Sequence, residues 1–213
     1  MMSMPRSFVR SLSVACAGLF VLVSVQAVSA QGQPQRAPGP RGAETDPRPA
    51  PPSQPQSLAT LYERLKATGT AQEAEVIVRQ IVRRWGRSGS DTSDLLMARA
   101  KEALGGQNAA LAVELLDRVL VLQPSWAEAW HTRGLAFFLM QDDGRALVDF
   151  REALRREPGH FMALGMAAAA LQRQGDERNA LNAYRAVQDL HPFFSGVKEA
   201  IEKLTPNVAG RDA

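Results

Sequence analysis

The sequence has 213 residues and a single cysteine, Cys16, which lies in an apolar run near the N-terminus. One thiol cannot form a disulfide within the chain, and it cannot supply the cysteine pairs of a zinc ribbon or a redox motif. The fold must therefore be held by the packing of side chains, without covalent cross-links.

Motifs that carry catalysis are also missing. The histidines are His131, His160 and His191; no two of them are spaced i, i+4, and no H-E-x-x-H pattern occurs. Neither G-x-G-x-x-G nor G-x-S-x-G is present. His160 and His191 both adjoin predicted turns, where they could approach each other. We expect no catalytic site, no metal and no cofactor; an enzyme whose site is invisible in the sequence is the weaker alternative.

A large excess of charge of one sign is absent as well. The 25 basic and 22 acidic side chains give a formal net charge of +3. Nucleic-acid-binding proteins usually carry a clear basic patch or stripe, which this balance does not indicate. With 45% hydrophobic and 22% charged residues, the composition is that of a globular domain.

A long, almost entirely apolar segment lies near the N-terminus. Residues 12–25 are almost entirely apolar, follow Arg6 and Arg10, and precede "AVSA", which ends at Ala30. This order is typical of a secretory signal peptide, here residues 1–30. The run would form a helix of about 21 Å, which is shorter than the ~30 Å hydrocarbon core and favours cleavage over an uncleaved anchor. We expect an exported protein of the periplasm or another part of the cell envelope, which loses Cys16 with the signal.

Residues 31–56 are rich in proline, glutamine, glycine and arginine and nearly free of apolar side chains. Such a segment cannot bury enough surface to offset the entropy lost on ordering. We predict a disordered linker, which is either a spacer that holds the domain away from a membrane or wall, or an inert N-terminus.

A repeat of 34 residues fills residues 93–194. In its middle copy, Trp130, Gly134, Ala146, Phe150 and Pro158 mark the pattern of large, small, small, large and proline. The corresponding positions are Leu96, Ala100, Ala112, Leu116 and Pro124 in the first copy, and Leu164, Ala168, Ala180, Tyr184 and Pro192 in the last. This period and order resemble the tetratricopeptide repeat (TPR), in which each repeat is a pair of antiparallel helices.

The resemblance implies an all-α fold, a right-handed α-solenoid with TPR units at 93–126, 127–160 and 161–194. In the middle unit we expect helices at about 127–140 and 144–156. Glycine inside the first helix costs about 1 kcal/mol relative to alanine. We expect that Gly134 allows close approach of the paired helix opposite Ala146, where a larger residue would force the helices apart.

Helical segments are also predicted on both sides of the repeats. Leu58–Ala67 and Ala71–Trp85 have apolar residues spaced by three and four. Together with a junction up to residue 92, this atypical pair, 57–92, is expected to cap or extend the stack. A capping helix is expected at 195–205, followed by a disordered tail at 206–213.

In the TPR family the first helix of each repeat lines a concave groove that binds partners. The positions that this resemblance assigns to the groove are Met97, Lys101, Glu128, His131, Leu135, Phe138, Leu139, Met162 and Arg173. Because Lys101 and Arg173 are its only basic members and none is asparagine, we do not expect a clamp for a C-terminal carboxylate. The apolar lining favours a protein or peptide partner such as an apolar helix. Alternatively, the chain's own terminal helices fill the groove.

These features favour an exported, non-enzymatic scaffold or adaptor that joins proteins of a bacterial cell-envelope complex. One alternative is a homo-oligomeric module, in which the 58–85 pair with its "VIVRQIVRRW" segment packs against a second copy. Another is a spacer tethered to a membrane or wall, with membrane attachment only if the signal remains uncleaved. No nucleic-acid partner is expected.

Overall fold

The structure is a computed structural model that describes residues 56–211, which belong to one compact unit. The predicted signal peptide, and the predicted linker except Gln56, lie outside the described residues. Within residues 56–211 all regular structure is helical, and no helix there is long and apolar enough to cross a bilayer. The helices are α1 (Leu58–Ala67), α2 (Ala71–Trp85), α3 (Asp91–Gly105), α4 (Ala109–Leu122), α5 (Ala127–Leu139), α6 (Asp143–Arg156), α7 (Phe161–Arg173), α8 (Glu177–Leu190) and α9 (Val197–Arg211).

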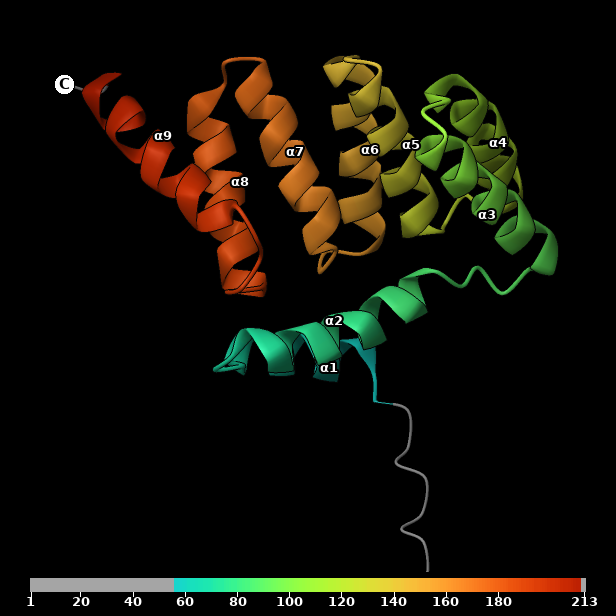
Figure 1. Ribbon diagram of the computed structural model, residues 1–213, viewed down its shortest axis with the longest axis horizontal. Coiled ribbons are helices and arrows are strands. Elements are labelled where there is room, and N and C mark those ends of the chain that lie inside the picture. Colours follow the sequence, from blue (N-terminus) through green and yellow to red (C-terminus); the bar gives the residue numbers. More distant parts are fainter. Residues whose placement is uncertain (1–55, 212–213) are drawn as a thin grey trace, which may run out of the picture. The chain divides into compact units, whose positions relative to one another are not determined.

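Helices α3 to α8 form three consecutive pairs, and every helix from α3 onward packs against the next one, up to α9 (Figure 1). The pairs coincide with the three predicted 34-residue units. The expectation of an all-α helical repeat fold is therefore confirmed.

The same turn joins the two helices of each pair. A residue with positive φ follows the first helix, and the next residue caps the second helix by accepting a hydrogen bond from a backbone N–H. These residues are Gln107 and Asn108, Gln141 and Asp142, and Gly175 and Asp176, spaced by the 34-residue period. Asn and Asp are among the best N-caps, so the turn sequence starts each second helix at a defined residue.

Small residues lie where the paired helices approach each other. Ala100, Ala146 and Ala180 are completely buried. A Cβ atom added to Gly134 would lie 2.7 Å from Cε1 of Phe150 and 3.2 Å from Cβ of Asp149. Gly134 is thus a close-approach site as predicted, and the atoms nearest to its added Cβ belong to Phe150 and Asp149.

Helices α1 and α2 form as predicted but do not lie at the start of the stack. Their apolar residues, among them Leu61, Ile77 and Ile81, pack around Phe161 at the beginning of α7. The ring of Tyr62 fits against Gly159, where an added Cβ would come within 2.5 Å of it. The pair therefore folds back onto the last repeat instead of capping or extending the stack before α3.

The C-terminal helix is longer than expected. It continues through Pro206 to Arg211, whereas the sequence predicted an end at 205 and a disordered tail. Leu204 is buried, and Val208, one turn later, packs against the cluster formed by α7, α8 and α9. This apolar contact holds the last turns in helical form.

Candidate binding groove

The structure divides the nine predicted groove residues among several environments. Met97 belongs to the buried cluster between α3, α4 and α5, so it is a core residue. Glu128 and His131 are also buried, whereas the side chain of Leu139 is 56% exposed. The predicted positions therefore do not form one continuous surface.

Three of them do meet in a pocket of about 380 Å³, which we call the groove pocket. It is bounded by α5, α7, α8 and the link into α9. Its lining consists of His131, Leu135, Met162, Gly165, Met166, Tyr184, Phe194, Ser195, Gly196 and Val197. Apolar side chains dominate this lining, as they do in most ligand sites of proteins.

The sequence indicated only one side of this pocket. His131, Leu135 and Met162 came from the groove positions of the first helices, but Met166, Tyr184 and the 194–197 link did not. The link closes the pocket because it turns from α8 into α9, which lies outside the 34-residue frame. The sequence feature that could have indicated this link is the combination of aromatic and small residues in "HPFFSG".

The N-terminal pair covers part of the groove without filling the pocket. Met162 and Phe194 both pack against the cluster made by α1 and α2. Leu135, Met162 and Met166 nevertheless remain only half-buried. The N-terminal helices therefore contact the groove at Met162, but they do not fill the pocket.

A buried carboxylate, Glu128, lies beside the pocket and is held by several nitrogen atoms. Lys101 Nζ lies 2.7 Å from Glu128 Oε1, and His160 Nε2 lies 3.2 Å from Oε2. His131 Nδ1 is 3.5 Å from Oε2 and has no hydrogen-bond partner among the described residues. Burial alone would raise the pKa of Glu128, but His131, His160 and Lys101 outweigh it and keep this pKa well below its ordinary value.

The position of the proton on His160 follows from its second role, as the N-cap of α7. His160 Nδ1 accepts a hydrogen bond of 3.1 Å from the backbone N–H of Ala163. Nδ1 therefore carries no proton, and in the neutral ring Nε2 must be the donor to Glu128. Burial lowers the pKa of His160 and thereby favours this neutral form, although Glu128 opposes the shift.

Glu128, His131 and His160 also offer three ligand atoms within 4.8 Å of one another, which is the spacing of a metal site. However, a metal ion at Nε2 of His160 would require the proton at Nδ1, directly against the N–H of Ala163. The ammonium of Lys101 already neutralises the carboxylate. The cluster therefore fits a structural network better than a metal site. His191 takes no part in it and packs against Phe161 and Phe194.

Trp85, at the end of α2, joins the N-terminal pair to this cluster. Its ring stacks on His160 with centroids 4.0 Å apart and planes within 7°. Its indole N–H donates to the hydroxyl of Tyr62 at 2.9 Å, and its carbonyl accepts from the indole of Trp126 at 2.6 Å. Sequence reasoning missed this contact because it depends on α2 folding back onto α7.

The two basic groove residues are both engaged in ion pairs. Lys101 binds Glu128, and the guanidinium of Arg173 binds Asp143 while lying 3.8 Å from the centre of the Phe138 ring. Neither cation is free to hold the carboxylate of a peptide terminus. A peptide carboxylate at this site would have to compete with Glu128 for Lys101 or with Asp143 for Arg173.

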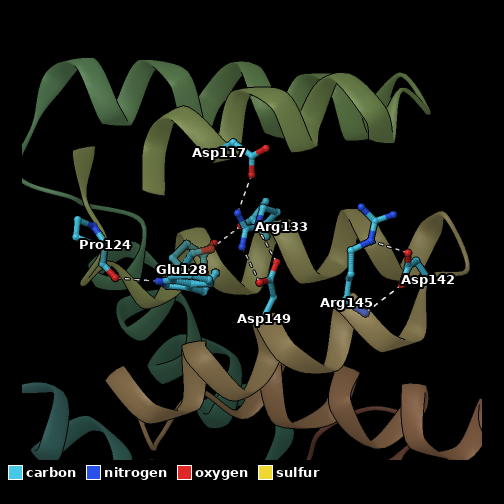
Figure 2. A network of polar contacts seen from close by, with 9 residues as sticks. Asp117, Pro124, Glu128, Arg133, Asp142, Arg145 and Asp149 are labelled. Carbon is cyan, nitrogen blue, oxygen red and sulfur yellow. Dashed lines mark hydrogen bonds and ion pairs between the residues drawn. The ribbon is translucent and has the colours of Figure 1, made fainter. Parts of the chain in front are cut away.

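A second ion network, shown in Figure 2, connects three helices around Arg133. Its guanidinium makes two hydrogen bonds of 2.8 Å to Asp149 on α6 and one of 2.7 Å to Asp117 on α4. Asp149 is almost completely buried, so this fork-like pairing supplies the partners that a buried carboxylate requires. The network is structural, because it ties α4, α5 and α6 together at their interface.

Comparison with known folds supports the arrangement of the helices. The TPR domain of Sgt2 from Aspergillus fumigatus is 18% identical and superposes with a TM-score of 0.54 over 58% of this chain and 83% of that one. The first TPR of Spaghetti (RPAP3), solved with the HSP90 peptide SRMEEVD, is 17% identical, with a TM-score of 0.55 over 56% of this chain and 95% of that one. At these identities the similarity concerns the fold alone.

A comparison of sequences shows the family more directly. No family model matches the sequence. However, a TPR repeat-containing protein of Rhizobium etli is 32% identical over 155 residues, which cover 73% of this chain and 76% of that protein. Together with the 34-residue period and the paired helices, this similarity shows that the chain belongs to the tetratricopeptide repeat family.

Proposed function

We propose that the chain is an exported, non-enzymatic scaffold that binds a protein or peptide partner in a bacterial cell envelope. The observation that carries the binding role is the groove pocket. Apolar side chains from several helices surround about 380 Å³ of space there, and repeat solenoids generally bind their partners on concave surfaces.

The lining of the pocket favours an apolar side chain of the partner. Leu135, Met162 and Met166 surround the space with flexible or branched apolar groups, and methionine adapts to side chains of different shapes. An amphipathic helix that inserts one apolar residue would use this surface well. A partner held mainly by its carboxylate would not, because Lys101 and Arg173 are already paired.

The pocket can be tested by site-specific crosslinking in the native cell. A photoreactive phenylalanine analogue placed at Leu135 of the full chain should give a discrete crosslinked species. The same analogue at Val148 on α6, whose side chain is 54% exposed and lies outside the pocket lining, serves as the matched control. Identical crosslinking patterns at the two positions would exclude the pocket as the binding site.

The proposal of export rests on the pattern of residues 1–30. The basic start, the short apolar run and the small residues before position 31 are typical of a cleaved signal. Mass spectrometry of the protein from its native cell should find Gln31 at the N-terminus. An intact N-terminus would instead favour a membrane-tethered spacer.

A further inference from the structure

The outer side of the first repeat is the most unusual surface in the described part of the chain. In a solenoid the terminal repeat normally presents a polar outer face or is covered by a cap. Here α1 and α2, which precede α3 in the sequence, pack around Phe161 on the last repeat. The outer side of α3 and α4 is therefore left without the helical pair that the sequence order would place on it.

That side is apolar where a cap would be expected. Leu95 on α3 is 55% exposed, and Leu111 and Leu122 on α4 are 42% and 51% exposed. A hollow of about 410 Å³ lies between the two helices. We call this surface the end face and define it as Leu95, Arg99, Glu102, Leu111, Leu115 and Leu122.

The residues of the end face share one side of their helices. Arg99, Glu102, Leu111 and Leu115 all line the hollow, so α3 and α4 present these positions to the same space. Leu95 lies one helical turn before Arg99, and Leu122 lies two turns after Leu115. The leucines of the end face thus lie on both sides of the charged pair, and Arg118 lies between Leu115 and Leu122 on the same side of α4.

The charges at the hollow make this surface complementary to itself. Arg99 and Glu102 have opposite charges and lie three residues apart on α3. Within the described residues, neither side chain forms an ion pair or a side-chain hydrogen bond. A two-fold axis through the hollow would reverse one α3 against the other and place Arg99 of one copy opposite Glu102 of its partner copy. The leucines would then cover each other.

We propose that the end face binds the end face of a second copy of this chain, which forms a two-fold dimer. This surface differs from the one predicted in the sequence, because the apolar residues of α2, such as Ile77, Ile81 and Trp85, are buried within the chain. The dimer would leave the groove pocket free, since no residue lines both surfaces. The dimer and the binding of a partner in the groove pocket can therefore be tested independently.

Sedimentation velocity of the purified full chain tests the apolar part of this interface. We expect dimerisation that depends on concentration, and Leu111→Lys should weaken it by about tenfold or more, because the lysine charge would be desolvated at the interface. Val148→Lys places the same charge on a similarly exposed apolar residue of α6 and should leave the dimer intact. A wild-type chain that is monomeric at every concentration, or equal effects of the two variants, would overturn the proposal.

A charge exchange tests the two-fold geometry itself. Arg99→Glu alone and Glu102→Arg alone should each weaken the dimer by about tenfold, because like charges then face each other. An equimolar mixture of the two variants should dimerise again, since every facing pair regains opposite signs. Circular dichroism should show wild-type helix content for both variants. If the mixture stays monomeric, the end face does not pair with itself. The better explanation would then be that residues 1–55 or another protein cover the end face.

Discussion

At the scale of single residues, Gly134 shows why the repeat keeps small side chains at fixed positions. A methyl group there would overlap the buried Phe150 ring, whereas nothing lies within 4 Å of a Cβ placed at Gly105 near the end of α3. We expect Gly134→Ala to lower the free energy of unfolding by about 1–2 kcal/mol, because overpacking outweighs the gain in helix propensity. Chemical denaturation should show this loss. Gly105→Ala, the matched control, should be neutral or slightly stabilising, and an equal loss in both variants would refute the steric explanation.

His160 should make stability depend on pH. Burial holds its folded-state pKa below the ordinary 6.5, so the unfolded chain takes up a proton at a higher pH than the folded chain. The free energy of unfolding should therefore fall as the pH decreases below about 7, and buried His191 should add a slope of the same sign.

The groups that face His160 are Glu128 and His131 on α5 and Trp85 on α2. His160→Asn removes the titrating ring but keeps an acceptor for the N-cap of α7. Thermal denaturation between about pH 7.5 and about pH 5.5 should show a flatter dependence in this variant than in the wild type. An unchanged slope would mean that His160 does not titrate between the two states.

Sequence reasoning at this scale succeeded where a residue's role repeats every 34 positions. Gly134, Ala100 and Ala180 could be identified as close-approach sites because the same size class recurs at the same place. Glu128 and His160 could not be recognised as partners, because their contact joins one repeat to the turn before the next one. Nothing in the local sequence of either residue indicates it.

At the scale of elements, the N-terminal pair depends on a glycine in a distant turn. The Tyr62 ring occupies the space where a side chain at Gly159 would lie, so Gly159→Ala should displace α1 and lower the free energy of unfolding by about 1–3 kcal/mol. Amide hydrogen exchange should increase in α1 and α2 but not in α3 to α6. Gly69→Ala, in the turn between α1 and α2 with no atom within 4 Å, is the control.

Removing the Tyr62 ring should offset part of the destabilisation that Gly159→Ala causes. The double variant Tyr62→Ala with Gly159→Ala is expected to lose less protection in α2 than the sum of the two single changes, because the added methyl group has room once the ring is gone. If the double variant loses more protection than the sum of the two single changes, the Tyr62 ring is not what obstructs a side chain at Gly159.

The bounds of the helices were largely predictable, but the position of the first pair was not. Apolar spacing fixed α1 and α2, and turn residues with a strong N-cap fixed the second helix of each repeat. Tertiary contacts, such as the stacking of Trp85 on His160, decide where an amphipathic pair of helices packs. The periodicity of the apolar residues does not predict these contacts. The extra turns of α9 likewise depend on Val208 finding an apolar surface.

At the scale of the whole molecule, the proposed dimer and the proposed partner use different surfaces. The dimer would join chains through α3 and α4, while the groove pocket lies between α5, α7, α8 and the start of α9. A dimer of this kind would present two pockets, so that a partner with two suitable segments could bind with higher avidity than a single pocket allows.

The most direct test of the binding role uses the methionine methyl groups, because few methionines occur in the described residues. Met162 and Met166 line the groove pocket, Met97 is buried in the first repeat, and Met140 is 44% exposed outside the pocket lining. A peptide from the partner identified by crosslinking at Leu135 would be added to the protein labelled with ¹³C at these methyl groups. We predict that the signals of Met162 and Met166 shift while those of Met97 and Met140 do not. A shift of Met140 with unchanged Met162 and Met166 would contradict binding in the groove pocket.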